Sequence, residues 1–258
     1  MSQVEHAAGQ CHPSNPQTAQ HLPLVIVQMG RPPQDIRDAL GEQGDWMTTA
    51  IGPVSMPVIV IRPEDNEPLP AAHELAGAVI TGSWSMVTDR LAWSETTAEW
   101  IRAMVAAQVP MLGVCYGHQL MADALGGTVD FHPKGREIGP QTVHLQGEWQ
   151  ADPLLGQLPN PLVAYLTHEQ SVLKAPNGAK VLGRSDHDSH QIIRYSPTAL
   201  SVQFHPEFTP ALMAACLLRR AEVFKQEGFD IDGMVASIQP TPDATHLLQA
   251  FVNEACLQ

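Results

Sequence analysis

The stretch Pro110-Met-Leu-Gly-Val-Cys-Tyr-Gly-His-Gln119 decides the fold expected of this chain. Its residues 111–114 are typical of a buried strand, and a helix-compatible run follows Cys115, which therefore occupies a sharp strand-to-helix corner. Gly113 and Gly117 each lie two residues from the cysteine, where small residues let the two elements pass close together. Such a corner directs its central side chain at the helix N-terminus, whose N–H groups and dipole favour a thiolate. The segment predicts a cysteine nucleophile, the alternative being a buried structural cysteine.

A second segment, Ser201-Val-Gln-Phe-His-Pro-Glu-Phe208, offers the partners that a cysteine nucleophile needs. A nucleophile requires a base within hydrogen-bonding reach, and the base requires a third group that fixes its orientation. In an extended segment residues i and i+2 face the same side, so His205 and Glu207 are expected to point together into one site. Pro206 between them is expected to stiffen that geometry.

The two segments together carry a family resemblance. Gly-Val-Cys-Tyr-Gly-His-Gln followed by Gln-Phe-His-Pro-Glu resembles the class I glutamine amidotransferases, most of all the glutaminase half of GMP synthase, over roughly residues 22–224. The resemblance implies Cys115 as the nucleophile, His205 as general base and acid, and Glu207 as the group that orients His205. It also implies glutamine, or another γ-glutamyl compound, as the substrate.

The resemblance implies an oxyanion hole as well. Related glutaminases have a glycine-rich loop after a strand, and Thr81-Gly82-Ser83-Trp84 stands at that place here. Carried over by position, the two donors are the backbone N–H groups of Ser83 and Tyr116, with Gly82 beside the substrate. This chain departs from the family pattern at Ser83, where a second glycine is usual, and at Trp84, where proline is common; the alternative is an ordinary turn between strand and helix.

Other residues are expected by resemblance to bind substrate. Gln119 corresponds to a family glutamine that contacts the substrate. The alternative is an ordinary helix residue that faces solvent. His168 lies in the segment 167–172, which resembles a run that touches the substrate's α-carboxylate through its backbone. The stretch Gly135-Arg-Glu-Ile-Gly139 also resembles a family feature and is assigned a structural role. Cys216 is expected on the apolar face of a helix, in the core.

Strand-like and helical patterns alternate through the first half of the chain and give way to short strands in the second. Alternation of this kind favours a doubly wound parallel sheet, in which ligands bind at the carboxyl ends of the strands. The expected strands are 24–28, 58–61, 76–81, 111–114, 141–145, 162–166, 180–182, 191–195 and 200–204. The expected helices are 33–40, 94–108 with Ser94 as its cap, 117–125, 211–226 capped by Thr209-Pro210, and 242–257.

The expected fold is therefore a single α/β domain with a doubly wound, mostly parallel sheet of flavodoxin-like type and an antiparallel or mixed extension. Residues 1–21 are rich in polar residues and proline and are expected to be a disordered leader. The domain is expected to span 22–258, with its last helix packed on the sheet. About 50 residues follow Phe208, too few for the ATP-dependent domain of GMP synthase, so a stand-alone glutaminase domain is expected.

Composition excludes several other classes of protein. With 14 basic and 27 acidic residues the net charge is −13, which argues against nucleic acid and anionic membranes as partners. No apolar run is long enough for a membrane span, and the N-terminal residues lack the apolar core of a secretory signal. The four cysteines (Cys11, Cys115, Cys216 and Cys256) have no paired or metal-like spacing. A cytoplasmic protein is expected.

No cofactor and no metal are expected. Neither a phosphate-binding loop of the Gly-x-x-x-x-Gly-Lys type nor a Gly-x-Gly-x-x-Gly turn is present. The segment Asp186-His-Asp-Ser-His190 could be a metal site, but short polar runs with two histidines are usually solvated loops.

The sequence leaves three functions open. The first is a glutaminase that cleaves glutamine through a thioester, with a separate synthetase as a possible partner. The second is a γ-glutamyl peptidase or hydrolase that acts on larger γ-glutamyl compounds with the same triad. The third is a regulatory module with an intact but idle triad, which is disfavoured because packing alone would not hold three reactive residue types at these spacings.

Overall fold

The computed structural model describes residues 22–255. One nine-stranded sheet organises the chain, and its parallel part runs in the order β2-β1-β3-β4-β11. These strands are β1 (Leu24–Val27), β2 (Val58–Ile61), β3 (Gly77–Ile80), β4 (Met111–Val114) and β11 (Ala199–Val202). This is the flavodoxin-like order with β1 between β2 and β3, as the sequence predicts. The expected leader, Cys11 and Cys256 lie outside the described residues.

The antiparallel extension begins beyond β11. The sheet continues as β10-β9-β6-β7, with each pair antiparallel. These strands are β6 (Glu137–Leu145), β7 (Leu162–His168), β9 (Lys180–Arg184) and β10 (Ile192–Arg194). A separate two-stranded sheet pairs β5 (Thr128–Phe131) with β8 (Gln170–Lys174). The sequence predicted the extension but missed β5 and β8.

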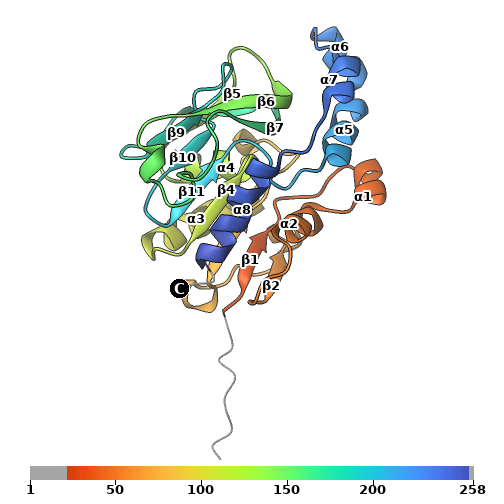
Figure 1. The fold of residues 1–258 in the computed structure, drawn as a ribbon. Helices are drawn as coiled ribbons and strands as arrows, with labels where there is room; N and C mark the ends of the chain where they lie inside the picture. Colours follow the sequence, from red (N-terminus) through yellow and green to blue (C-terminus); the bar gives the residue numbers. More distant parts are fainter. Residues whose placement is uncertain (1–21, 256–258) are drawn as a thin grey trace, which may run out of the picture.

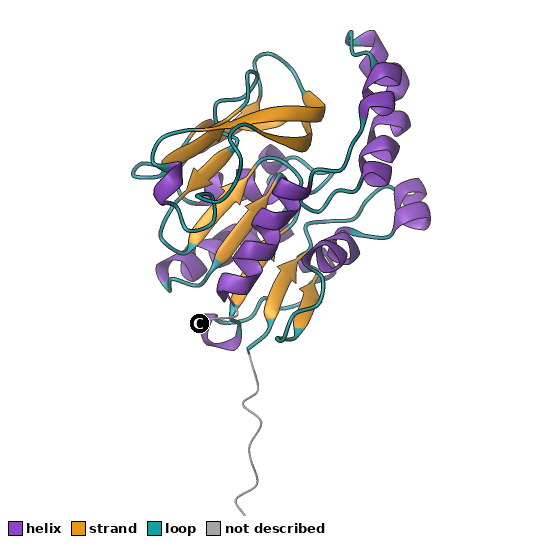
Figure 2. Cartoon of the chain, viewed as in Figure 1, coloured by secondary structure: helices purple, strands orange, loops and turns teal. Residues whose placement is uncertain are grey.

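Helices cover both faces of the parallel sheet, since alternate side chains of each strand point to opposite faces. Leu24 and Ile26 of β1 pack with α2 (Gln43–Ile51) and α8 (Pro242–Ala255), whereas Val25 and Val27 pack with α3 (Ala92–Ala106) and α4 (Tyr116–Ala124). Figures 1 and 2 show α8 lying across the near face of the sheet. Burial of each Leu or Ile side chain stabilises such layers by about 1.5–3 kcal/mol.

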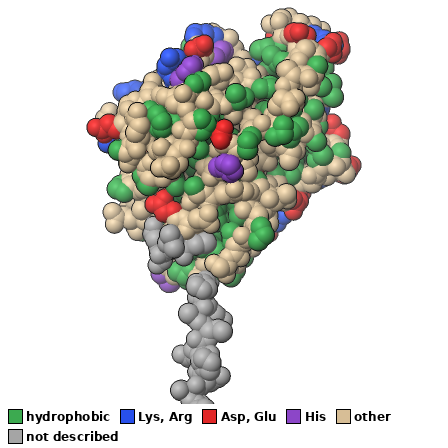
Figure 3. All heavy atoms as spheres, viewed as in Figure 1, with side chains coloured by type: hydrophobic (Ala, Val, Ile, Leu, Met, Phe, Trp, Pro, Cys, Tyr) green, Lys and Arg blue, Asp and Glu red, His purple; other side chains and the backbone are tan. Residues whose placement is uncertain are grey.

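A helical arm stands beside the antiparallel strands. It consists of α5 (Pro210–Arg219), α6 (Ala221–Gln226) and α7 (Ile231–Ser237) and packs on α1 (Gln34–Leu40), as Figure 1 shows. A third apolar cluster lies under the arm, with Trp46, Tyr165 and Phe208 among its members. On the face drawn in Figure 3, Lys and Arg side chains lie towards the edges and form no broad basic patch.

Several expected helix boundaries were wrong. Helix α3 begins two residues before Ser94, whose buried hydroxyl pairs with the Tyr116 hydroxyl at 2.7 Å instead of capping the helix. The single helix expected at 211–226 is broken at Arg220, whose guanidinium turns towards Glu169 at 2.7 Å. Thr209 caps α5 as predicted, because its hydroxyl accepts from the Leu212 N–H at 3.2 Å. The sequence missed α2 and α7.

The close approach of α4 to the sheet depends on Gly117. A Cβ at this position would lie 2.4 Å from the Ile80 carbonyl oxygen. An ordinary helical Gly→Ala change stabilises a protein by up to about 1 kcal/mol. We expect Gly117→Ala to destabilise it by about 1–3 kcal/mol instead, because strand and helix must move apart. Urea unfolding of both proteins measures the difference, and a stabilised variant would contradict this packing.

Candidate active site

Cys115 occupies the corner between β4 and α4. Its backbone has φ 52° and ψ −102°, a left-handed φ that a non-glycine residue rarely adopts. Its N–H donates to the Val202 carbonyl at 2.9 Å, which ties the corner to the end of β11. A Cβ on Gly113 would lie 2.6 Å from the Gly117 carbonyl oxygen, so small residues are needed on both sides of the corner. The strained corner predicted from the sequence is present.

The side chains of His205 and Glu207 come together because the backbone turns between them. Strand β11 ends at Val202, and the Phe208 N–H approaches the His205 carbonyl at 3.5 Å. The expectation of an extended segment is therefore wrong. The residues still converge, with His205 Nδ1 and Glu207 Oε1 2.8 Å apart and both side chains buried.

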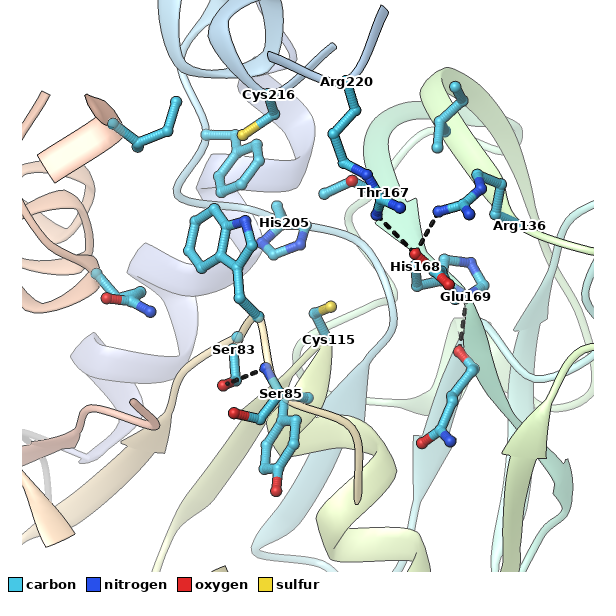
Figure 4. Close-up of a pocket in the computed structure, with 18 of the residues that line it drawn as sticks. Ser83, Ser85, Cys115, Arg136, Thr167, His168, Glu169, His205, Cys216 and Arg220 are labelled. Atoms are coloured by element: carbon cyan, nitrogen blue, oxygen red, sulfur yellow. Dashed lines mark hydrogen bonds and ion pairs between the residues drawn. The ribbon is translucent and has the colours of Figure 1, made fainter. Parts of the chain in front are cut away.

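The other ring nitrogen of His205 is directed towards the cysteine side of the site. His205 Nε2 is buried and has no hydrogen-bond partner within residues 22–255 that meets normal geometry. Burial lowers the pKa of His205, but the neighbouring Glu207 carboxylate, which also accepts its hydrogen bond, and the Cys115 sulfur outweigh this effect and raise the pKa to about 10. Figure 4 shows Cys115 and His205 entering the same cleft. The arrangement favours the protonated form of the imidazole beside the Cys115 sulfur.

The predicted oxyanion donors lie on two backbone segments that touch each other. The Gly117 N–H donates to the Thr81 carbonyl at 3.1 Å, which holds the first turn of α4 against the loop after β3. Within the described part of the chain, the N–H groups of Ser83 and Tyr116 donate no hydrogen bond. A Cβ on Gly82 would lie 2.9 Å from His205 Cε1, so the loop approaches the imidazole closely.

The two predicted substrate-binding side chains are engaged by the protein itself. Gln119 Nε2 donates to the Gln170 carbonyl at 2.6 Å and to Gln203 Oε1 at 3.0 Å. His168 places Nδ1 2.9 Å from the same carbonyl and Nε2 3.1 Å from Glu137 Oε2. Gln119 is buried against this network and does not face solvent. Both residues therefore stiffen the wall on which Gln170 lies.

All the predicted site residues border one cleft, which encloses about 900 Å³ including open solvent. They are Gly82, Ser83, Cys115, Tyr116, Gln119, His168, His205 and Glu207. Cys216 of α5 packs against the third apolar cluster, as expected, and it also borders the cleft; burial raises the pKa of its thiol to about 12.

Two walls of the cleft escaped the sequence analysis. One is charged: Glu169 pairs with both Arg136 and Arg220, and this network joins the helical arm to the antiparallel strands (Figure 4). The other comes from the α1–α2 region and includes Ile36, Gln43 and Trp46. Arg136 lies in the stretch 135–139, which resembles a family feature, and this resemblance could have pointed to its place at the site. Nothing local in the sequence marks the α1–α2 residues.

Comparisons with known proteins identify the family of this chain. The family model "Glutamine amidotransferase class-I" matches residues 42–222. The chain is 32% identical over 148 residues to a glutamine-hydrolysing GMP synthase subunit from Methanopyrus kandleri, covering 57% of this chain and 74% of that protein. It is also 32% identical over 146 residues to the GMP synthase of Gloeothece citriformis, covering 55% of this chain but only 25% of that longer protein.

Solved structures show the same fold. A glutamine amidotransferase from Thermotoga maritima has a TM-score of 0.71 at 16% identity, covering 92% of this chain and 99% of that chain. One from Methylobacillus flagellatus has a TM-score of 0.67 at 25% identity, covering 90% and 95%. Among residues 22–255, no helix has the length and apolarity that crossing a membrane requires. The family match and the Methanopyrus kandleri relative show that the chain belongs to the class I glutamine amidotransferases.

Proposed function

We propose that the protein hydrolyses the γ-amide of glutamine through a Cys115-His205-Glu207 triad. One observation carries the proposal: the His205 imidazole binds Glu207 through Nδ1 at 2.8 Å, and its buried Nε2 is left for the cysteine side of the site. A nucleophile, a base and an orienting carboxylate in this order are the components of acyl transfer.

The reaction has two halves, and His205 moves a proton in each. The Cys115 thiolate attacks the γ-carbonyl carbon, and the backbone N–H groups of Ser83 and Tyr116 stabilise the oxyanion. The C–N bond breaks as His205 gives its Nε2 proton to the departing amine, which leaves a thioester on Cys115. His205 then takes a proton from water, whose oxygen attacks the thioester and releases glutamate and the thiolate.

Glu207 acts through His205 and not on the substrate. Its carboxylate holds the imidazole in one orientation and stabilises the imidazolium form, as the raised pKa of His205 reflects. Because Glu207 is buried, the interaction is screened little by solvent.

The relatives suggest where the ammonia goes. The Methanopyrus kandleri protein is named as one subunit of a glutamine-hydrolysing GMP synthase. We propose that, when glutamine is the substrate, a separate synthetase chain receives the ammonia. The side-chain chemistry of the cleft requires no metal or cofactor for hydrolysis itself.

A glutamate-release assay with the purified chain and glutamine tests the function. We expect turnover that follows the chain in size-exclusion fractions and is lost on alkylation of Cys115. If neither glutamine nor any other γ-glutamyl amide released glutamate, with or without added synthetase, the proposal would be wrong.

A further inference from the structure

An aromatic wall extends from the catalytic imidazole towards α2. Phe208 stacks on His205 with ring centroids 3.9 Å apart, and Trp46 meets the Phe208 ring edge-on at 6.0 Å. Trp84, from the loop after β3, packs edge-on against Trp46, with ring centroids 6.1 Å apart. Trp84 is 37% exposed although it borders the cleft, so a large apolar surface is open there. Ammonia gains nothing from such a wall.

A buried polar side chain lies at the same wall. Gln43, at the start of α2, borders the cleft and is 1% exposed. Both its Nε2 and its Oε1 are buried without a hydrogen-bond partner within residues 22–255. Buried amides are nearly always hydrogen-bonded, so an amide that lacks both partners calls for a specific explanation. A ligand group that both donates and accepts would satisfy it.

The chemistry of the site tells which part of a substrate reaches this wall. His205 protonates the departing nitrogen, so the group attached to that nitrogen lies beside the imidazole and the Phe208 ring stacked on it. With the leaving group there, the part of the cleft bordered by Gln119, His168 and Gln170 is left for the γ-glutamyl part. The space bordered by Trp46, Trp84 and Gln43 is thus on the side of the leaving group.

We propose that Gln43, Trp46, Trp84 and Phe208 form a leaving-group subsite for a γ-glutamyl compound whose amine carries an apolar side chain and a neutral amide, as in a γ-glutamyl peptide. The inference rests on the proposed hydrolysis and specifies its substrate. The apolar side chain packs on Trp84, and the amide pairs with Gln43, giving N–H to Oε1 and accepting from Nε2. Hydrolysis forms a thioester with Cys115, releases the amine with a proton from His205, and consumes one water.

Steady-state kinetics with three substrates test the subsite: glutamine, γ-glutamyl-phenylalaninamide and γ-glutamyl-phenylalanine. We expect wild-type kcat/KM for the phenylalaninamide compound to exceed that for glutamine by about ten-fold or more. The phenylalanine compound should fall between them, because its carboxylate can accept from Gln43 but cannot donate to it.

Two variants separate the subsite from the catalytic groups. Gln43→Leu keeps the side-chain size but loses both polar atoms, and it should lower kcat/KM for the phenylalaninamide compound roughly five-fold more than for glutamine. Trp84→Ala should also reduce the ratio of kcat/KM for each phenylalanine compound to kcat/KM for glutamine. Gln34→Leu makes the same chemical change on the exposed surface of α1 and should leave all three values as in wild type.

The outcomes distinguish this inference from the function on which it rests. If wild type hydrolysed glutamine at least as well as the phenylalaninamide compound, the subsite would be refuted and the glutaminase would stand. The subsite would also be refuted if Gln43→Leu lowered kcat/KM by the same factor for all three substrates. If wild type released glutamate from none of the substrates, both proposals would fail. Retained glutamine turnover in Gln43→Leu shows that the variant is folded.

Discussion

Cys115→Ser is expected to abolish glutamate release while the protein stays folded. The strained corner places this side chain in the cleft, beside the His205 imidazole that serves it in the proposed mechanism. A serine hydroxyl is far less ionised than an activated thiol, so we expect a loss of about 10³-fold or more in kcat. The melting temperature should change little, because the two side chains are similar in size.

Cys216 supplies the matched control for this variant. It borders the same cleft, but burial raises the pKa of its thiol to about 12 and so disfavours the thiolate form. Cys216→Ser should retain activity, and mass spectrometry of rapidly quenched wild type should find the glutamyl adduct on the peptide that contains Cys115. Activity above a few per cent in Cys115→Ser, or an adduct on Cys216, would show that the nucleophile is misassigned.

His205→Ala should slow the reaction about 10²–10⁴-fold, and Glu207→Gln should slow it less. In the proposed mechanism His205 moves protons in both half-reactions, whereas Glu207 only holds the imidazole, 2.8 Å from its Nδ1. A glutamine at position 207 can still accept this hydrogen bond through its amide oxygen. Measurement of kcat for both variants at saturating substrate decides the order of the effects.

The pH profile of Glu207→Gln adds a readout that a folding defect would not produce. The Glu207 charge raises the pKa of His205, so its removal lowers that pKa. The descending limb of kcat at high pH, where the imidazolium loses its proton, should therefore move to lower pH in the variant. Equal losses in the two variants with an unchanged limb would mean that Glu207 is not the partner of the catalytic base.

Local sequence patterns were sufficient to predict the strand-to-helix corner at Cys115, but they did not predict the backbone geometry after β11. The run 111–114, the flanking glycines and the helix-compatible residues all act within a few positions of Cys115, and the structure has the corner they predict. Alternation alone predicted an extended segment for His205 and Glu207. The structure has a turn there. The His205 N–H does not continue the pairing of β11 with its neighbouring strands but donates to the carbonyl of Tyr165 in β7 at 2.9 Å.

The cleft walls illustrate the same limit. Gln43 and Trp46 lie about 70 residues before Cys115 in the chain, and their helix gives no local sign of facing the site. Arg220, where the expected helix breaks, likewise pairs with a residue far away in the chain, Glu169, 51 positions before it. Contacts of this kind depend on long-range packing, which periodicity and residue preference do not describe.

By itself the sequence determined the fold class and named the candidate reactive residues, since strand period, glycine placement and side-chain chemistry are local properties. The tertiary structure alone decided which residues meet. The parallel pairing of Val202 with Val114 places the end of β11 beside Cys115 and brings His205 to the site across about 90 residues of chain. The same packing sets the aromatic wall and Gln43 against the cleft. The physical reason is that hydrogen-bond register and burial are properties of the whole sheet and core, not of any one segment.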